Sequence, residues 1–358
     1  MSDFGRNFLP GPTDVHPEVL AAQLTPMFSH RSKRMQEILA AMQPSLQECF
    51  GTAQPVFLST SSATGLIEGA VRSGVRQRVL VATGGYFGEY FAKTAEHCGK
   101  QALRIPVEPG RAITAEQLAA ALDTHKVDAV AVVHSESSTG ALADIPALAK
   151  VVRAKSDVLF LVDGVTSVGA MPILMDAWGV DFYCTGSQKA MALPPGLGLG
   201  AASERFVARA SQQRDAGFYL SIARMVSIAR QNLPIWTPAV SLIMALECQL
   251  ARIARDGGWP IRWARHRAML GTVERWITAR GDVKLLAPEG ARSPAISSVL
   301  LPDGADPAGL IRTLEERGYL VGGALDPSHG PLFRIGHMGD LTPAHLEGLL
   351  AVVSELLG

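Results

Sequence analysis

The sequence lacks an excess of charge of either sign, and this absence limits the partners that it can have. Its 33 lysine and arginine residues are matched by 33 aspartate and glutamate residues, which gives a formal net charge of zero. Such a chain has no general attraction for nucleic acid or for an anionic membrane. Any anion that it binds must be held by a local site, which we expect to be a pocket.

Cysteines and long apolar runs are also scarce. The four cysteines, Cys49, Cys98, Cys184 and Cys248, are dispersed without a C-x-x-C pair or a histidine at metal-ligand spacing, so we expect buried thiols and no metal site. Pro10 interrupts the amino terminus before an apolar signal segment can form, and no later run approaches about twenty apolar residues. These features favour a cytoplasmic location.

Short apolar segments that alternate with helical patterns are abundant. A length of 358 residues, with 47% hydrophobic and 18% charged residues, indicates about two globular domains. From about residue 55 to 203 the alternation predicts a mainly parallel sheet covered by helices. The strongest strands, 128–135 and 157–164, are almost entirely apolar, which is typical of the centre of such a sheet. Ligands bind at the carboxyl ends of strands in sheets of this kind.

The pattern changes after Pro238. Long helices and strand-like segments follow one another at 239–256, 258–279, 294–301, 306–317, 331–336 and 342–357. This order indicates a second, smaller α+β domain. We therefore expect three parts, namely an N-terminal segment that joins the active site (1–20), a large α/β domain (21–255) and a small C-terminal α+β domain (256–358).

A lysine ends the most informative segment of the chain. In DFYCTGSQK, residues 181–189, a short strand ends in small polar residues and leads to Lys189, just before a Pro-Pro-Gly turn. A lysine that attacks a cofactor carbonyl needs such a setting, because it must be partly desolvated and fixed at a strand end. A solvated loop lysine is the competing interpretation, and the neighbouring motifs argue against it.

Asp163 closes the most hydrophobic strand, 26 residues before Lys189. An ionised carboxylate is costly in that position unless it meets a cation. A pyridinium nitrogen would be such a cation, and the aspartate would keep it protonated so that the ring withdraws electrons. A helix cap after the strand is the alternative interpretation.

Two loops carry residues of the kind that bind a cofactor. Residues 59–65, STSSATG, precede a helical pattern, and free N–H groups at a helix start bind phosphate, although ordinary helix capping explains the same run. Residues 84–88, GGYFG, offer an aromatic ring that can lie flat against a ligand, with core packing as the alternative.

Other catalytic motifs fail on spacing. Residues 196–200, GLGLG, are similar to a dinucleotide fingerprint but follow a Pro-Pro pair instead of a strand that leads into a helix. Residues 164–169, GVTSVG, contain one residue too many for a nucleophile elbow, and no H-E-x-x-H motif occurs. Dinucleotide, hydrolase and zinc-enzyme chemistry are therefore disfavoured.

In their order along the chain, these segments resemble the class V aminotransferases of the fold type I pyridoxal-phosphate enzymes, particularly the alanine–glyoxylate and serine–pyruvate group. The matching segments cover nearly the whole chain and are FLPGPT (8–13), SSATG (61–65), ESSTG (136–140), Val162-Asp163, GSQKA (186–190), PPG (194–196) and FRIG (333–336). The GSQK segment, with Asp163 at its distance, is highly specific. The resemblance implies the fold type I architecture, a mainly parallel central sheet with a smaller α+β C-terminal domain.

The resemblance also implies roles for individual residues. Lys189 would be the Schiff-base lysine, Asp163 the partner of the ring nitrogen, and Arg334 with Gly11 the site for the substrate carboxylate. Thr237 would reach the phosphate of the partner subunit, so we expect a homodimer with shared active sites. The other cofactor contacts would be Ser62, Ala63, Thr64 and Gln188 at the phosphate, Phe87 against the ring and Ser137 near the ring hydroxyl.

The implied activity is a ping-pong transfer of an amino group from alanine or serine to glyoxylate or pyruvate. Ile235 and Tyr90 depart from the pattern, because relatives often have tyrosine and arginine there. Another pyridoxal-phosphate reaction, such as that of a lyase or a cysteine desulfurase, is an alternative, although no cysteine occupies a glycine-rich loop. A cofactor-binding protein without turnover is a further alternative, and it would have no use for Arg334.

Overall fold

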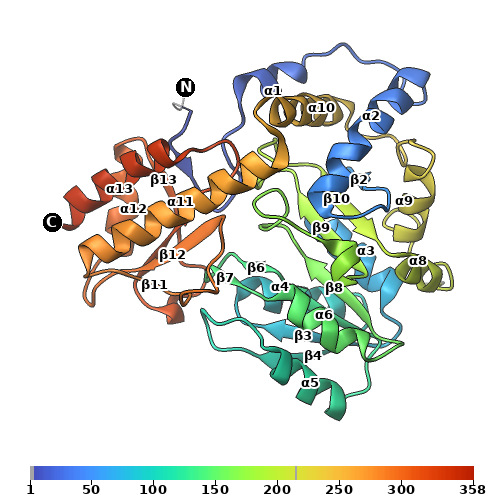
Figure 1. The fold of residues 1–358 in the computed structure, drawn as a ribbon, viewed down its shortest axis with the longest axis horizontal. Coiled ribbons are helices and arrows are strands. Elements are labelled where there is room, and N and C mark those ends of the chain that lie inside the picture. Colours follow the sequence, from blue (N-terminus) through green and yellow to red (C-terminus); the bar gives the residue numbers. More distant parts are fainter. Residues whose placement is uncertain (1–3, 214–215) are drawn as a thin grey trace.

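The computed structural model describes residues 4–213 and 216–358. Two sheets lie beside each other, each with its own helices (Figure 1). The larger sheet is built from strands between residues 57 and 202. The smaller sheet combines strands between residues 284 and 336 with one short strand near the amino terminus.

The larger sheet is mainly parallel, as predicted. Its order is β2 (Phe57–Ser59), β10 (Gly198–Ala202), β9 (Phe182–Gly186), β8 (Leu159–Asp163), β5 (Ala129–Val133), β3 (Arg78–Thr83) and β4 (Gln101–Pro106). The pairs β9–β8, β8–β5, β5–β3 and β3–β4 are parallel, whereas β10 is antiparallel to both β9 and β2. The two strongest predicted strands are therefore β5 and β8, at inner positions of the sheet. The segment GLGLG contributes to β10, which is a strand and not a nucleotide-binding turn.

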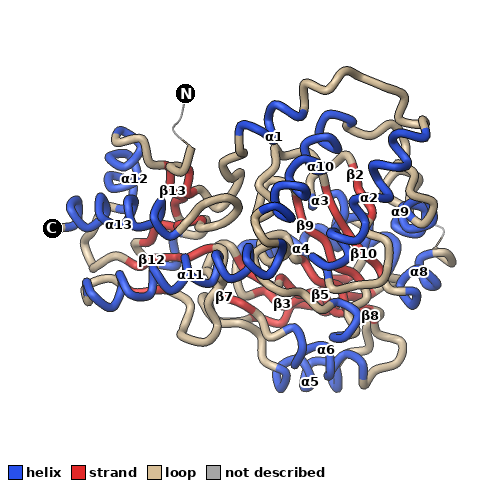
Figure 2. The backbone as a smooth tube through the Cα atoms, turned by 45° about the horizontal axis from the view of Figure 1, so that its top comes forward, coloured by secondary structure: helices blue, strands red, loops and turns tan. Residues whose placement is uncertain are grey.

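Helices cover both faces of this sheet (Figure 2). Side chains alternate along a strand, so Phe160 and Val162 of β8 enter one core while Leu159 and Leu161 enter the other. The first core takes its helical residues from α1 (Pro17–Ala22), α2 (Lys33–Phe50), α5 (Ala115–Thr124), α6 (Ile145–Arg153), α7 (Met175–Trp178), α10 (Val240–Arg255) and the start of α11 (Gly258–Arg280). The second core takes them from α3 (Ala63–Gly74), α4 (Tyr86–His97), α8 (Glu204–Ala210) and α9 (Ile222–Ala229).

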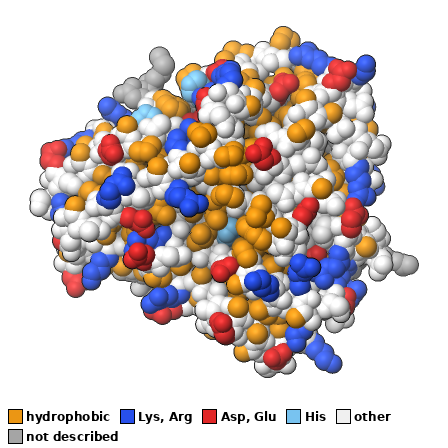
Figure 3. Space-filling model, in the orientation of Figure 1, with side chains coloured by type: hydrophobic (Ala, Val, Ile, Leu, Met, Phe, Trp, Pro, Cys, Tyr) orange, Lys and Arg blue, Asp and Glu red, His pale blue; other side chains and the backbone are white. Residues whose placement is uncertain are grey.

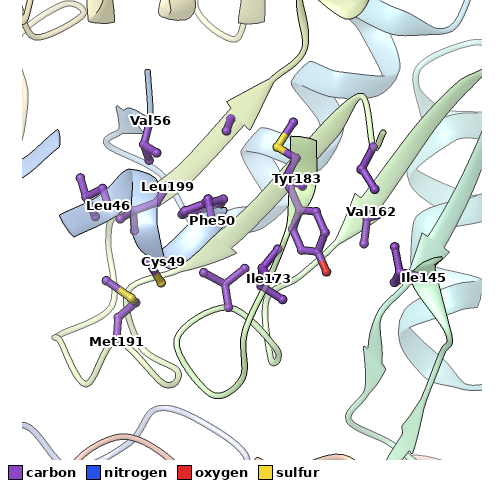
Figure 4. Close-up of a cluster of buried hydrophobic side chains, with 14 of the residues drawn as sticks. Leu46, Cys49, Phe50, Val56, Ile145, Val162, Ile173, Tyr183, Met191 and Leu199 are labelled. Carbon is purple, nitrogen blue, oxygen red and sulfur yellow. The ribbon is translucent and has the colours of Figure 1, made fainter. Parts of the chain in front are cut away.

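Figure 4 shows part of the first core, where Leu46 and Phe50 of α2 lie beside Leu199 of β10. The ring of Tyr183, from β9, lies between Val162 and Ile173 in the same picture. Its hydroxyl bonds Nδ1 of the buried His134. Burying these strands on both faces holds their carboxyl ends in fixed positions, and those ends carry the polar residues of the candidate site.

The smaller sheet has the order β1 (Asn7–Phe8), β13 (Leu320–Gly323), β14 (Leu332–Gly336), β12 (Ile296–Leu300) and β11 (Lys284–Leu285). Its helices are α11 (Gly258–Arg280), α12 (Pro307–Glu316) and α13 (Pro343–Leu357). Phe333 and Ile335 of β14 enter the core formed with these helices. Arg334 lies between them in sequence and therefore points to the opposite face of the sheet, toward the larger domain.

The elements predicted for the C-terminal part are confirmed as α10, α11, β12, α12, β14 and α13. Strands β1 and β13 were not predicted, and the hairpin of β6 (Ser135–Glu136) with β7 (Ala141–Leu142) was not either. Strand β1 is too short to give a periodic signal, because only Asn7 and Phe8 pair with β13. The expectation of four buried thiols was half wrong, since Cys49 and Cys184 are buried but Cys98 and Cys248 are partly exposed.

On the face shown in Figure 3, basic and acidic side chains are interspersed, and hydrophobic side chains gather near the centre. No area of a single charge dominates that face, which agrees with the zero net charge of the sequence. Within the described ranges, none of the helices is both long and apolar enough to cross a bilayer.

Candidate active site

A cavity of about 500 Å3 opens where the carboxyl ends of β5, β8 and β9 meet the amino ends of α3 and α4. Nine of the predicted site residues line it, namely Gly11, Ser62, Ala63, Thr64, Phe87, Ser137, Asp163, Gln188 and Lys189. Two others, Arg334 and Thr237, are not among the described residues of the cavity wall. The structure thus brings nine of the eleven predicted site residues together in one place.

Lys189 follows β9 and is 8% exposed. Its Nζ donates a hydrogen bond to the carbonyl of Pro10, which belongs to the N-terminal segment. Burial lowers the pKa of Lys189 to about 8, because the charged form loses its hydration; the charge of Asp163 opposes this shift and that of Arg334 adds to it. A lysine with this pKa supplies far more neutral amine near neutral pH than a lysine at the ordinary pKa of 10.5, as a nucleophile or general base requires.

Gly11 packs directly on the Lys189 side chain. A Cβ atom at Gly11 would lie 3.0 Å from Nζ and 2.9 Å from Cδ, and the backbone there has a φ of 115°, which favours glycine. The backbone of the lysine loop is held by the same segment. Thr13 N–H donates to the Gln188 carbonyl at 3.1 Å, and Thr13 Oγ1 donates to the Lys189 carbonyl at 3.3 Å. The N-terminal segment therefore forms one wall around the lysine.

Asp163 ends β8 and is 5% exposed. Its Oδ1 accepts a hydrogen bond from Val165 N–H at 2.8 Å, and Oδ2 has no partner among the described residues. Burial raises the pKa of Asp163 to about 6, an effect that Glu136 reinforces and Lys189 opposes. A cation placed in the cavity would reverse this shift, so the carboxylate is suited to a protonated ring nitrogen.

The start of α3 forms a possible anion site. Ser62 is the N-cap residue in an extended conformation, but its side chain makes no capping hydrogen bond. The N–H groups of Ala63 and Thr64 have no partner among the described residues, and both residues line the cavity. Unpaired N–H groups at the positive end of a helix dipole attract a phosphate.

Phe87 lies in the first turn of α4, and a buried carboxylate fixes that turn. Glu136 accepts hydrogen bonds from Phe87 N–H at 3.1 Å and from Gly88 N–H at 3.0 Å. It also accepts from the hydroxyl of Ser138 at 2.6 Å. Glu136 stands in the ESSTG motif but had no predicted role, because only the structure shows that its carboxylate caps α4.

Ser137 and Thr166 form a polar pair on the cavity wall. Their hydroxyl oxygens are 2.6 Å apart, and both residues line the cavity. Ser137 was predicted to lie near the ring hydroxyl of the cofactor, whereas Thr166 was missed. The segment GVTSVG was considered only as a nucleophile elbow, and its threonine gives no separate signal in the sequence.

Arg334 lies behind the cavity wall and is 7% exposed. Its Nε donates to the Gly323 carbonyl at 2.7 Å and its Nη1 to the Ser137 carbonyl at 3.0 Å, while Nη2 has no partner among the described residues. Burial lowers the pKa of Arg334 to about 10, with Glu136 opposing, so the side chain stays charged at neutral pH. One guanidinium N–H group is thus left for an anionic ligand.

Thr237 is exposed in the single chain and lies outside the cavity. The two positions that depart from the family pattern have different surroundings. Tyr90 lines the cavity and stacks on Tyr86 with ring centroids 6.3 Å apart, whereas Ile235 lines a separate small hollow near α2 and β2. An aromatic ring therefore occupies a place on the wall where the family resemblance led us to expect a cation.

The sequence profile described as aminotransferase class-V matches residues 18–323. The chain is 33% identical to an L-aspartate–glyoxylate aminotransferase of Paracoccus denitrificans, over 94% of this chain and 87% of that protein. It is 32% identical to a serine–glyoxylate aminotransferase of Methylorubrum extorquens, over 97% and 90%. Its structure superimposes on an alanine–glyoxylate aminotransferase of Nostoc sp. with a TM-score of 0.92, at 28% identity, covering 99% and 95% of the two chains.

The fold and the site together define a pyridoxal-phosphate-dependent aminotransferase of fold type I. Within that class, the chain belongs to the class-V aminotransferase family. The residues present fit the cofactor, because the cavity combines unpaired helix N–H groups, a buried carboxylate and a buried amine. These three features match a phosphate, a ring nitrogen and an aldehyde.

Proposed function

We propose that Lys189 carries the cofactor and moves the proton during amino-group transfer. The observation that carries this proposal is the pairing of a buried amine of lowered pKa with the buried carboxylate of Asp163 in one cavity. When bound, pyridoxal phosphate supplies an electron sink for the carbanion at the substrate Cα. The Lys189 amine, once released from the cofactor, would accept the Cα proton and pass it to the cofactor, so that the amino group stays there when the keto acid leaves.

We assign the other residues by their chemistry. Asp163 would keep the ring nitrogen protonated, and the start of α3 at Ser62, Ala63 and Thr64, with Gln188, would hold the phosphate. The ring of Phe87 would lie against the cofactor, and Ser137 would bond its ring hydroxyl. Each of these residues lines the cavity in which Lys189 lies.

We infer that Arg334, with Gly11, binds the carboxylate of a small amino donor such as alanine or serine. The free Nη2 of Arg334 supports this assignment. Lys189 is the single cation among the described residues that line the cavity, so a distal carboxylate would have no partner there within one chain. Glyoxylate and pyruvate are the expected acceptors, in a ping-pong reaction. The three relatives described above differ in the named donor but share glyoxylate.

We further propose a homodimer in the cytoplasm, with a segment (1–20), a large domain (21–255) and a small domain (256–358) in each subunit. Thr237 would complete the phosphate site of the partner, because in its own chain it is exposed and is not among the described residues of the cavity wall. The exposed side chains of Leu24, Met27 and Phe218, 83%, 68% and 65% accessible, support an extensive contact between copies.

A cysteine desulfurase would need a cysteine that reaches the substrate. No cysteine is among the described residues of the cavity wall, and Cys184 is fully buried within β9. A protein that binds the cofactor without turnover would not need an arginine with a free N–H group beside the cavity. The site therefore favours amino-group transfer.

The test is a panel of amino donors against glyoxylate, pyruvate and 2-oxoglutarate with the purified holoenzyme. Alanine and serine should give the highest kcat/KM, and glyoxylate or pyruvate should be preferred over 2-oxoglutarate. In the absence of an acceptor, alanine should release one pyruvate per active site, as a ping-pong mechanism requires. A strong preference for aspartate or glutamate would contradict the assignment of small donors.

A further inference from the structure

An arginine of helix α11 holds the loop that follows Lys189. Arg262 of α11 is 4% exposed and donates to the buried carbonyl of Ala190 through Nε at 3.2 Å and Nη2 at 2.7 Å. Ala190 is the residue directly after Lys189. One edge of the guanidinium therefore binds the backbone carbonyl of the residue next to the lysine.

The other edge of the same guanidinium binds an aspartate of the smaller domain. Arg262 Nη1 donates to Asp340 Oδ1 at 2.7 Å. Asp340 lies in the turn that follows β14, the strand that carries Arg334. A planar guanidinium can hold two acceptors at fixed directions, which an ammonium group cannot do.

The turn after β14 is also fixed at its neighbouring residue. His266 Nε2 accepts from Gly339 N–H at 3.1 Å, and Arg265 Nη2 donates to the Gly339 carbonyl at 2.9 Å. Gly339 lies against the lysine loop as well, because a Cβ atom there would come within 3.1 Å of Ala192 Cβ. Helix α11 thus joins the lysine loop and the end of the Arg334 strand.

We propose that Arg262 is a positioning residue of the amino-transfer reaction. Its side chain fixes the position of the Lys189 loop relative to the strand that carries Arg334. The inference rests on the proposed roles of these two residues. Arg334 would fix the substrate carboxylate while Lys189 takes the proton from the adjacent Cα, so their relative position decides whether the amine reaches that proton. A misplacement of about 1 Å can cost about a hundredfold in rate.

Removing Arg262 does not leave Asp340 without partners. Arg252 Nη1 donates to Asp340 Oδ2 at 2.8 Å, and Gln249 Nε2 donates to Oδ1 at 3.1 Å. Variants at position 262 are therefore expected to fold. Arg262→Lys keeps a charge beside Asp340 but loses the planar guanidinium that donates in fixed directions to both Asp340 and Ala190, and Arg262→Met removes both contacts.

The chain offers a control at the opposite end of β9, the strand that precedes Lys189. Arg205 binds the buried Asp181, just before β9, through Nε at 3.0 Å. It also donates to the carbonyls of Ser156 at 3.1 Å and Val158 at 3.0 Å. Arg205→Lys removes a guanidinium that likewise bridges a carboxylate and backbone carbonyls, but at the end of β9 away from Lys189.

The experiment compares wild type, Arg262→Lys, Arg262→Met and Arg205→Lys. Steady-state kinetics give kcat and the donor KM, and borohydride reduction followed by mass spectrometry gives the rate at which apoenzyme attaches the cofactor to Lys189. We expect both Arg262 variants to lose roughly ten- to hundredfold in kcat and in attachment rate, with a much smaller change in KM. Arg205→Lys should keep both rates near wild type, even where its melting temperature falls.

Wild-type rates in Arg262→Lys and Arg262→Met would overturn the proposal. An equal loss of both rates in Arg205→Lys would also overturn it, because a general loss of stability would then account for the effect. If the wild type itself attaches no cofactor to Lys189 or transfers no amino group, the proposed function fails, and the role of Arg262 fails with it.

Discussion

In the larger sheet, Asp163 and Lys189 stand at or just beyond the carboxyl ends of β8 and β9, whereas in the smaller sheet Arg334 lies in the interior of β14. The first two residues face the cavity directly. Arg334 approaches it from behind the wall, held by the carbonyls of Gly323 and Ser137. The mainly parallel sheet therefore exposes its functional residues at one edge, while the mainly antiparallel sheet packed against it contributes a residue through its face.

The two sheets therefore contribute different functional groups to the site. The larger sheet carries the groups that would act on the cofactor and on the proton, both buried and both shifted in pKa. The smaller sheet carries the group that would recognise the substrate carboxylate. Substitutions in the larger sheet should therefore affect chemistry, and substitutions in the smaller sheet should affect recognition.

The largest effect is expected for Lys189→Ala. Loss of the amine should lower kcat at least about ten-thousandfold, because the attachment point and the general base are removed together. Borohydride reduction and mass spectrometry should find no covalently attached cofactor. Covalent attachment that persists in this variant would show that another residue carries the cofactor and would break the assignment of chemistry to the end of β9.

Asp163→Asn should lower kcat by roughly a thousandfold while the cofactor stays bound, because an amide cannot stabilise a protonated ring nitrogen. The amide oxygen of the substituted side chain can still accept from Val165 N–H, so the local geometry should persist. Turnover and cofactor affinity, measured on the same preparation, separate the two effects. Near-normal turnover would mean that the larger sheet does not supply the partner of the ring nitrogen.

Arg334→Ala should lower kcat/KM for alanine or serine by about a hundredfold to a thousandfold, because the substrate carboxylate would be left without its charged partner. Attachment of the cofactor to Lys189 should stay close to normal. Arg312→Ala, on the exposed side of α12 in the same domain, is the matched control. If both variants behave like wild type, the smaller sheet does not recognise the carboxylate.

The smallest effect concerns the stability of the cofactor-free chain. The pKa of Asp163 rises from 3.8 to about 6 on burial, so its contribution to stability is fully present below about pH 3.8 and is lost as the pH rises through about 6. A difference of about two pKa units corresponds to about 3 kcal/mol at pH 7. Asp163→Asn should therefore raise the free energy of unfolding by about that amount in urea titrations at pH 7.

The gain should disappear in titrations near pH 4, where the native carboxyl is already protonated in the folded chain. A variant that is equally stabilised at both pH values would contradict the pKa shift. If the variant is stabilised at pH 7 but not near pH 4, this result and the loss of turnover together would show that the larger sheet keeps a destabilising charge because the chemistry requires it.

Local patterns were sufficient for the larger domain. The apolar runs at 128–135 and 157–164 predicted β5 and β8, and parallel strands place their carboxyl ends at one edge, so Asp163 and Lys189 were expected to meet. The Ser/Thr run before α3 was expected at the same edge. In each case the sequence signal lies within a few residues of the functional group. The regular geometry of the sheet then brings these groups to the same edge.

The contacts between distant segments had no local signal. Strand β1 pairs with β13 across more than three hundred residues of sequence, and the segment that follows β1 brings the Pro10 carbonyl to Lys189. The hydrogen bonds made by Glu136 and Arg262 were missed for the same reason, since a charged residue in a motif or on a helix does not reveal its hydrogen-bond partners.

The sequence by itself determined the family, the mainly parallel sheet and the lysine and aspartate at its edge, because short-range periodicity and motif spacing encode strands and their ends. The tertiary structure alone decided how Arg334 approaches the cavity and how α11 joins its strand to the Lys189 loop. These arrangements depend on how two sheets pack against each other, and packing is set by the burial of whole faces rather than by any single segment.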